Sequence, residues 1–198
     1  MDTSVSSGEA CDVVVVGAGI VGATVAVGLA RRGLSVAVLE AQQVAGGATG
    51  RSAGIVATGL PGHYARAVRA FGREAARTLW ALTVEGRERL AEAARSLGIA
   101  WKRTGSLLLA STPEEADSLR ASAEMLREDG FEPRWEPEDP LERGFLGALR
   151  WADDGVVDAA DLTRALLASA TVTVHTGTEA LSLEKDGDGI RVWAYRRT

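Results

Sequence analysis

The chain has 198 residues, of which 46% are hydrophobic and 25% are charged, and its formal net charge is −5. This length can bury a sizeable core in one or two domains, and the acidic balance argues against nucleic acid as a partner. A single cysteine, Cys11, excludes an internal disulfide and a zinc site built from cysteines. We expect a globular protein without a metal. The start of the chain lacks a signal-peptide pattern, which favours the cytoplasm.

The segment 12–40 contains the strongest local signal, after a start (1–10) whose composition predicts disorder. It reads DVVVVGAGIVGATVAVGLARRGLSVAVLE. Four β-branched residues predict a buried strand over 13–16, and three glycines in the spacing G-x-G-x-x-G follow it. A helix is expected over 23–32 and a second strand over 35–39. This β-turn-α-β unit is typical of a dinucleotide-binding site.

Each glycine of the motif has its own expected role. Gly17 allows the tight turn out of the strand, Gly19 removes a Cβ where a pyrophosphate would approach, and Gly22 lets the helix pack closely on the sheet. The start of the helix then presents free N–H groups and a partial positive charge to phosphates. Glu40 can accept hydrogen bonds from both ribose hydroxyls and would repel a 2′-phosphate, so NADP is disfavoured.

Two other interpretations of this stretch compete with a dinucleotide site. The spacing could arise by chance in a chain with 23 glycines, but strand, helix and terminal acid follow it in register. Residues 13–30 could also be taken for a membrane span, since they carry no charge over about 18 positions. Four internal glycines, a strand-like beginning and the lack of a flanking basic cluster argue against a span. A dinucleotide site in a soluble domain is favoured.

The next segment, AQQVAGGATGRSAGIVATGLPG, is rich in small residues and has one cation, Arg51. Such a loop could present backbone amides to phosphates and a flat ring, or it could simply be flexible. His63 follows, and it could either approach a substrate or be a spectator in the loop.

Residues 64–97 keep a spacing of three to four between apolar positions, which predicts one long helix or two helices joined near Gly86. The expected buried stripe is Val68, Phe71, Ala75, Leu79, Leu82, Leu90, Ala93 and Leu97. The opposite face is expected to be solvated, with Arg66, Arg69, Arg73, Arg77, Arg87 and Arg89 interleaved with glutamates.

The rest of the chain alternates between strands and helices. Strands are expected over 101–110, 146–153 and 171–175, helices over 112–129 and 158–170, a loop over 132–142, and a hairpin over 179–195. Thr112 is the expected N-cap of the first of these helices, with Glu115 at the capping-box position. The third strand of the nucleotide-binding sheet is therefore expected only after an excursion into a second, mixed α/β layer.

With these motifs the chain resembles the N-terminal half of the D-amino-acid oxidase/glycine oxidase/sarcosine oxidase (DAO) family of FAD-dependent oxidoreductases. The matching pieces are the first motif, GGATGRSAGI, DDGVVDAADLTRALLASA and VTVHTGTEALSLEKDGDGIRV. The resemblance implies an α/β fold: a Rossmann-like FAD-binding domain of glutathione-reductase-like ββα topology, interrupted by part of a mixed α/β substrate domain. The FAD-binding domain would take in 11–62 and 156–198, and the substrate domain 63–155.

The resemblance also implies which residues would contact FAD. At the pyrophosphate these are Gly17, Ala18, Gly19, Ile20, Val21 and Gly22. Glu40 and Ala41 would hold the adenosine ribose and its surroundings. Thr49, Gly50, Arg51 and Ser52 would approach the pyrophosphate or the flavin side, and Ala53 and Gly54 would lie along the flavin ring. Ala180 stands where the family usually has a valine whose backbone contacts the adenine.

The function implied is oxidation of an amine or amino acid at its CH–NH group, with hydride transfer to flavin N5. The groups that clamp the substrate come largely from the C-terminal half in this family, so no catalytic residue is assigned here. The chain is expected to be truncated, with little activity alone. Two alternatives stay open: a non-catalytic FAD-binding subunit that needs a partner chain, and another NAD or FAD enzyme that shares only the first motif.

Overall fold

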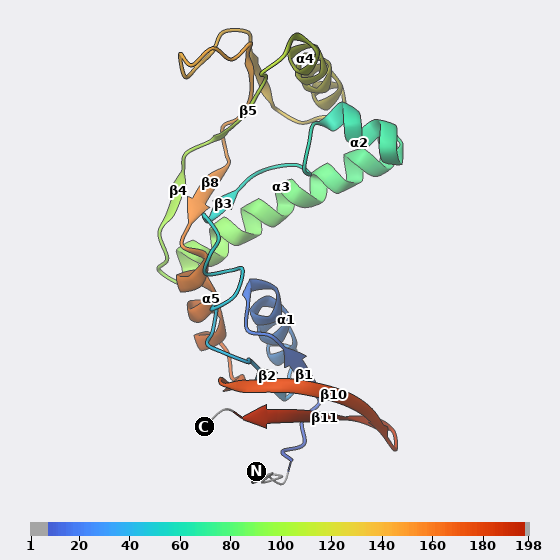
Figure 1. Ribbon diagram of the computed structural model, residues 1–198, viewed down its shortest axis with the longest axis vertical. Helices are drawn as coiled ribbons and strands as arrows, with labels where there is room; N and C mark the ends of the chain where they lie inside the picture. The colour runs from blue at the N-terminus through green and yellow to red at the C-terminus, as the bar shows by residue number, and fades with distance from the viewer. Residues whose placement is uncertain (1–7, 197–198) are drawn as a thin grey trace. The chain divides into compact units, whose positions relative to one another are not determined.

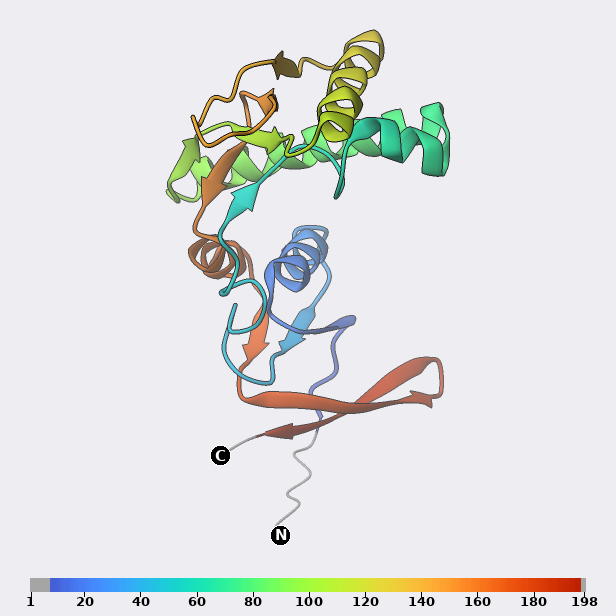
Figure 2. The ribbon, with the colours of Figure 1, turned by 45° about the horizontal axis from the view of Figure 1, so that its top comes forward.

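The computed structural model describes residues 8–196 and divides into two compact units (Figures 1 and 2). The terminal unit contains the described residues up to Ala53 and those from Asp158 onward, and the inserted unit is Gly54–Val157. Most of the segment predicted to be disordered, 1–10, lies outside the described residues, and positions 8–10 belong to no helix or strand.

The terminal unit is built on a parallel sheet of three strands in the order β1-β2-β9. Strands β1 (Val13–Val16) and β2 (Val36–Leu39) come from the first motif, and β9 (Thr173–His175) comes from the far end of the chain. The late arrival of the third strand, expected from the sequence, is confirmed.

Two helices complete the core of this unit. Helix α1 (Ile20–Ala30) packs against α5 (Ala159–Ala168), and their small residues allow close approach. The buried residues of this core are Ala18, Ala23, Ala26, Val27, Val36, Val38 and Leu167. The uncharged stretch 13–30 is thus divided between a strand and a short helix. Within residues 8–196, no helix combines the length and the apolar character that crossing a membrane would need.

The terminal unit ends in a long antiparallel hairpin, which Figure 1 shows in orange and red. It is formed by β10 (Thr178–Asp186) and β11 (Gly189–Arg196), and the turn between them is the one predicted. A bulge at Leu181 interrupts the register between Ala180 and Ser182.

The inserted unit contains two small antiparallel sheets and three helices. One sheet has the order β3 (Ile55–Val56), β8 (Gly155–Val157), β4 (Trp101–Arg103), and the other β5 (Ser106–Leu109), β7 (Ala148–Trp151), β6 (Arg134–Glu136). The helices are α2 (Tyr64–Phe71), α3 (Arg73–Ser96) and α4 (Pro113–Glu128). Their core centres on Tyr64, whose ring meets that of Trp80 edge-on at 4.9 Å.

The long helix predicted over 64–97 is two helices, but they join at Gly72 and not at Gly86. Gly72 has φ +83° and ψ 158°, a conformation that only glycine adopts readily, so the helix has to end there. Gly86 lies inside α3, where an added Cβ would meet nothing within 4 Å. Gly86 therefore does not interrupt the helix.

The predicted buried stripe on this segment was wrong in part: five of its residues are half-buried, and Ala75 is exposed. The five are Val68, Leu79, Leu90, Ala93 and Leu97. The break at Gly72 makes α3 a separate helix, and its orientation is set by the packing of Trp80 against Tyr64. The buried positions of α3 are Ala76, Trp80, Arg87 and Ala94. Phe71 and Leu82, predicted to be buried, are 58% and 57% exposed, while Arg87, predicted to be solvated, is buried.

The remaining predictions for the inserted unit differ from the structure in smaller ways. The strand predicted over 101–110 is two strands, β4 and β5, separated at Thr104 and Gly105 so that they join different sheets. The predicted loop 132–142 contributes β6 to the second of these sheets. The N-cap prediction is confirmed, because the Thr112 hydroxyl accepts a hydrogen bond from the Glu115 N–H at 3.2 Å.

Candidate dinucleotide-binding site

The turn between β1 and α1 depends on its glycines. Gly17 has φ +97°, and its N–H donates to the Leu39 carbonyl at 2.8 Å, which ties the turn to the end of β2. Any Cβ on Gly22 would clash with the Gly17 carbonyl oxygen, so only glycine allows α1 to start this close to the strand. A Cβ on Gly19 would lie 3.1 Å from the Thr49 hydroxyl.

The first turn of α1 is arranged to receive an anion. Its N-cap residue, Gly19, has no side chain to occupy the N–H groups of the first turn, and that turn contains no acidic residue. The Ile20 N–H donates to the Thr49 hydroxyl at 3.1 Å. The N–H groups of the next two residues, Val21 and Gly22, lie too early in the helix to have an intrahelical acceptor. The helix dipole adds positive potential at this end. Val21, on this turn, is 74% exposed.

Glu40 is held against the same turn by both of its carboxylate oxygens. Oε2 accepts from the Ala18 N–H at 2.8 Å, and Oε1 accepts from the Gln42 N–H at 2.8 Å. The Glu40 backbone is fixed as well, since its N–H donates to the His175 carbonyl at 2.9 Å and its carbonyl accepts from Thr178 at 2.8 Å. A carboxylate oxygen has a second lone pair, so a fixed Glu40 can still accept from a ribose.

The loop after Glu40 folds back onto the glycine turn. The Ala45 N–H donates to the Ala18 carbonyl at 3.0 Å, and Thr49 meets the start of α1 through its hydroxyl. Arg51 Nη1 donates to the Gly46 carbonyl at 3.2 Å within the loop, and Arg51 is exposed. The structure therefore brings together the glycine turn, Glu40 and Thr49 through direct hydrogen bonds.

The other predicted site residues lie further along the same segments. Ala41, Gly50, Ser52 and Ala53 belong to the loop, and Ser52 and Ala53 are exposed. Ala180 lies at the start of β10, two residues after Thr178, which is bonded to Glu40. Gly54 is the first residue of the inserted unit.

The residues present fit a dinucleotide that carries a pyrophosphate and an unphosphorylated ribose. Backbone donors and a positive helix end suit the pyrophosphate, and the fixed carboxylate suits the ribose hydroxyls. The outer side of the turn is open, because a Cβ added at Gly17 or Gly47 would meet nothing within 4 Å. By contrast, no group of three or more His, Cys, Asp or Glu side chains within residues 8–196 could hold a metal ion.

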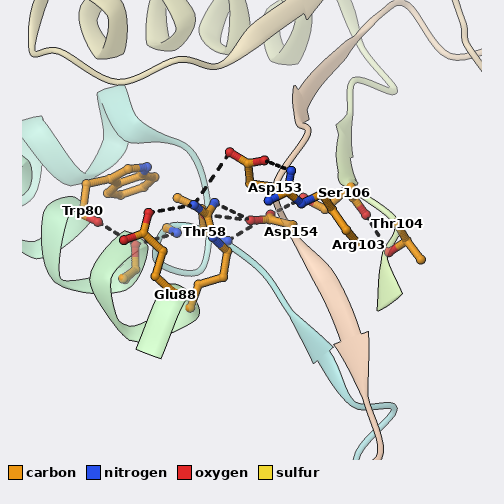
Figure 3. Close-up of polar contacts among 12 residues, drawn as sticks. Thr58, Trp80, Glu88, Arg103, Thr104, Ser106, Asp153 and Asp154 are labelled. Carbon is orange, nitrogen blue, oxygen red and sulfur yellow. Dashed lines mark hydrogen bonds and ion pairs between the residues drawn. The ribbon is translucent and has the colours of Figure 1, made fainter. Parts of the chain in front are cut away.

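A second polar cluster, which the sequence did not predict, lies inside the inserted unit (Figure 3). The Asp154 carboxylate, fully buried, accepts hydrogen bonds from Thr58, Arg87 and Ser106. These residues are far apart in the sequence, and Arg87 stands among other charged residues of α3. One feature of the sequence could have indicated that Arg87 is buried. It lies seven residues after Trp80 and seven before Ala94, and residues seven apart share one face of a helix.

His63 has a structural role at the start of α2. Its Nδ1 accepts from the Arg66 N–H at 3.3 Å, and the ring also lies 3.3 Å from the Ser122 hydroxyl. Burial lowers the pKa of the imidazole, and the charges of Arg69 and Arg66 lower it further. His63 therefore caps the helix as a neutral side chain.

The parallel sheet, the glycine turn and the fixed acid together define an α/β protein of the dinucleotide-binding class. Comparison with known families narrows this. A model of FAD-dependent oxidoreductases of the DAO family matches residues 12–198. The chain belongs to that family, and FAD is confirmed as the cofactor of the family to which it belongs.

Individual relatives agree with the family. A glycine oxidase of Geobacillus kaustophilus (strain HTA426) is 30% identical over 190 residues, which are 90% of this chain and 49% of the relative. Its crystal structure has a TM-score of 0.75 at 27% identity, covering 93% of this chain and 51% of that one. The gamma-glutamylputrescine oxidoreductase of Escherichia coli (strain K12) is 34% identical over 119 residues, which are 58% of this chain and 27% of the relative.

A glycerol 3-phosphate dehydrogenase of Caloramator mitchellensis is 26% identical over 198 residues, 94% of this chain and 39% of the relative. The chain spans about half the length, or less, of these curated relatives.

Proposed function

We propose that this chain is the FAD-binding part of an oxidoreductase that acts on the CH–NH group of an amine or amino acid. The terminal unit would bind FAD, and the inserted unit would belong to the substrate domain. The observation that carries the proposal is the glycine turn at 17–22, to which both Glu40 and Thr49 are hydrogen-bonded.

The residues of the turn would bind the two ends of the ADP half of the cofactor. The turn 17–22 would surround the pyrophosphate, with the N–H groups of Gly19, Val21 and Gly22 as donors, because those of Gly17, Ala18 and Ile20 already donate within the protein. The Glu40 carboxylate, with Ala41 beside it, would hold the ribose. The Thr49 hydroxyl accepts from Ile20, so its own proton can be donated to a phosphate oxygen. Arg51 would add a positive charge on the same side, next to Gly50 and Ser52.

The remaining contacts would orient the flavin and the adenine. The backbone of Ala53 and Gly54 would lie along the flavin ring, and the backbone of Ala180 would contact the adenine. A bound flavin would supply the acceptor, at N5, for a hydride from the carbon next to the substrate nitrogen. The contribution of this chain is then orientation of the reacting ring, which is a large part of catalysis when the cofactor supplies the chemistry.

The amine substrate is supported by the names of two relatives, glycine oxidase and gamma-glutamylputrescine oxidoreductase. The glycerol 3-phosphate dehydrogenase is the specific observation for a second candidate, oxidation of an alcohol that carries a phosphate. Anaerobic addition of glycine or of glycerol 3-phosphate to the FAD-loaded protein distinguishes them. Bleaching of the flavin bands by glycine supports the first proposal, and bleaching by glycerol 3-phosphate alone contradicts it.

Cofactor binding itself is tested by titrating FAD into the wild-type chain and two glycine variants. Gly19→Val places a branched side chain against Thr49 and in the space proposed for the pyrophosphate, so we expect FAD binding at least about 100-fold weaker. Gly28→Ala is the matched control, because its Cβ would meet only Arg32 Nη1, at 3.8 Å. Equal FAD binding by Gly19→Val and the control contradicts the site. Binding of NADH in place of FAD by the wild-type chain contradicts the cofactor.

A further inference from the structure

We infer that Asp154 and Arg87 are positioning residues for the cofactor site: their buried ion pair fixes the backbone that begins at Gly54. The inference rests on the proposed function, in which Ala53 and Gly54 lie along the flavin ring. It concerns how the inserted unit holds the residue that directly follows the cofactor loop.

The Asp154 carboxylate joins four segments of the inserted unit. It accepts from the Thr58 N–H at 3.0 Å and the Thr58 hydroxyl at 2.6 Å, from the Ser106 hydroxyl at 2.6 Å, and from Arg87 Nη1 at 3.2 Å. Its backbone carbonyl accepts from the Gly105 N–H at 2.8 Å. Figure 3 shows these bonds converging on one side chain between β8, α3 and the segment after β3. A buried carboxylate with four donors is a fixed point in the fold.

Arg87 connects this point to the longest helix of the unit. Its Nη1 also donates to the Thr58 hydroxyl at 2.9 Å, so Thr58 bridges both charges. Its Nη2 lies 3.6 Å from Glu88 and 4.0 Å from Asp153. The arginine side chain is 7% exposed, which makes the pair with Asp154 a buried one. Removing one member of such a pair leaves the other buried without compensation, so each member is needed to keep the other in place.

Gly54 lies at the other end of the short ladder that this cluster closes. Strands β3 and β8 pair Ile55 with Val156 and Val56 with Gly155. At one end of the ladder the Val157 N–H donates to the Gly54 carbonyl at 3.0 Å, and the backbones approach so closely that a Cβ on Gly54 would clash with the Val157 carbonyl. At the other end, Thr58 is bonded to Asp154.

The two ends of the ladder therefore share one register. A strand of two residues has too few ladder bonds to hold its own register, and a slip of one residue would reverse its faces. The bonds from Asp154 to Thr58 prevent that slip. Gly54 and Val157 are also the residues where the chain enters and leaves the inserted unit. Loss of the Thr58 contacts should therefore displace Gly54 and Ala53 without removing any group proposed to touch FAD.

The test compares FAD binding by conservative variants. Thr58→Val removes the hydroxyl that bridges Asp154 and Arg87 but keeps the volume and the backbone N–H, and Thr58→Ser restores the hydroxyl. Asp154→Asn keeps the shape of the side chain and removes its charge. Tyr64→Phe is the control for general destabilisation, because it removes the hydrogen bond from the Tyr64 hydroxyl to Asp129, 2.6 Å long, elsewhere in the same unit.

The dissociation constant for FAD and the positions of the bound flavin bands are measured at a temperature where circular dichroism shows each variant folded. We expect roughly tenfold weaker binding and shifted bands for Thr58→Val and Asp154→Asn, and values within about twofold of wild type for Thr58→Ser and Tyr64→Phe. Wild-type affinity and bands in Thr58→Val overturn the inference, as does an equal loss in Tyr64→Phe. If the wild-type chain takes up no FAD, the proposed function fails, and the inference fails with it.

Discussion

The two units hold their key polar groups in opposite ways. In the terminal unit, the first turn of α1 has N–H groups without an intrahelical acceptor, and the glycines at 17, 19 and 22 place no side chain there. In the inserted unit, Asp154 and Arg87 are buried, and their side chains satisfy one another. The first arrangement leaves bonding capacity for a ligand, whereas the second uses it inside the protein.

This difference determines how each region responds to substitution. At the glycine turn, an added side chain would disrupt packing or fill the space proposed for the pyrophosphate. Removing atoms harms the buried cluster, because each partner leaves an unpaired group behind. Four of the five tryptophans lie in the inserted unit, and the fifth, Trp193, lies in the terminal unit. Tryptophan fluorescence therefore reports mainly on the unfolding of the inserted unit.

The largest effect on stability is expected from breaking the buried pair. Arg87→Met should destabilise the inserted unit by about 3–5 kcal/mol, because Asp154 would be left fully buried without its cationic partner. Urea unfolding followed by tryptophan fluorescence measures this. Arg89→Met is the control, since Arg89 makes only an exposed pair with Glu85 and should cost less than about 1 kcal/mol. Equal costs for the two variants would contradict the importance of the buried pair.

The next effect is expected at the glycine turn. Gly22→Ala should destabilise the terminal unit by about 3 kcal/mol, because the added Cβ would clash with the Gly17 carbonyl and α1 would have to move. Far-UV circular dichroism during thermal unfolding measures the change. Gly28→Ala, on the same helix, should be neutral or slightly stabilising. The packing argument is wrong if both alanine variants melt at the same temperature.

A pair of glycine variants distinguishes the true helix junction from the false one. Gly72→Ala should cost about 1–3 kcal/mol, since alanine does not readily adopt φ +83° with an extended ψ. Gly86→Ala should instead stabilise α3 by about 0.5–1 kcal/mol, because Gly86 lies inside the helix with open space beside it. Urea unfolding of both variants measures the signs, and a reversal would place the junction at Gly86.

The smallest effect is a pH dependence at the start of α2. The pKa of His63 is lowered from its ordinary value of 6.5, chiefly by burial, so the unfolded chain takes up the proton first. The stability contributed by the neutral cap is complete above about pH 6.5 and is lost as the pH falls below it, and a lost cap costs about 1 kcal/mol.

The measurement is the unfolding free energy at about pH 7.5 and about pH 5.5 for wild type and His63→Asn, which keeps a capping acceptor that does not titrate. The carboxylates of Glu136 and Asp139 also have lowered pKa values. The Arg150 hydrogen bond lowers the pKa of Glu136. Desolvation raises the pKa of Asp139, but four backbone N–H donors together lower it by more. Both carboxylates titrate below this window. An equal pH dependence in His63→Asn would show that another group is responsible.

The parts of the fold that the sequence predicted correctly are those specified by neighbouring residues. The turn after β1, the Thr112 cap of α4 and the hairpin around 186–189 each need only a few consecutive side chains. The sequence also predicted the late third strand, because a β-branched run at 171–175 is a local signal. The family resemblance then placed the candidate site on the same turn.

The parts that were missed depend on contacts between distant residues. A glycine in the sequence does not show whether its conformation requires glycine, so the pattern allowed one long helix or a junction near Gly86 and did not indicate Gly72. Arg87 is one of several arginines on α3, and its helical spacing from Trp80 and Ala94 gives no indication of its partner Asp154, which lies 67 positions away. The same limit applies to Thr58 and Ser106, which have no feature that links them before the chain folds.

The central claim is that the glycine turn and Glu40 hold the ADP half of FAD. Calorimetric titration of the wild-type chain with FAD, ADP and FMN tests it most directly, because ADP carries the pyrophosphate and ribose that these residues would bind and FMN carries the flavin without them. We predict that ADP binds and competes with FAD, and that FMN binds far more weakly than ADP. Binding of FMN as tight as that of ADP, or no binding of ADP, would contradict the account.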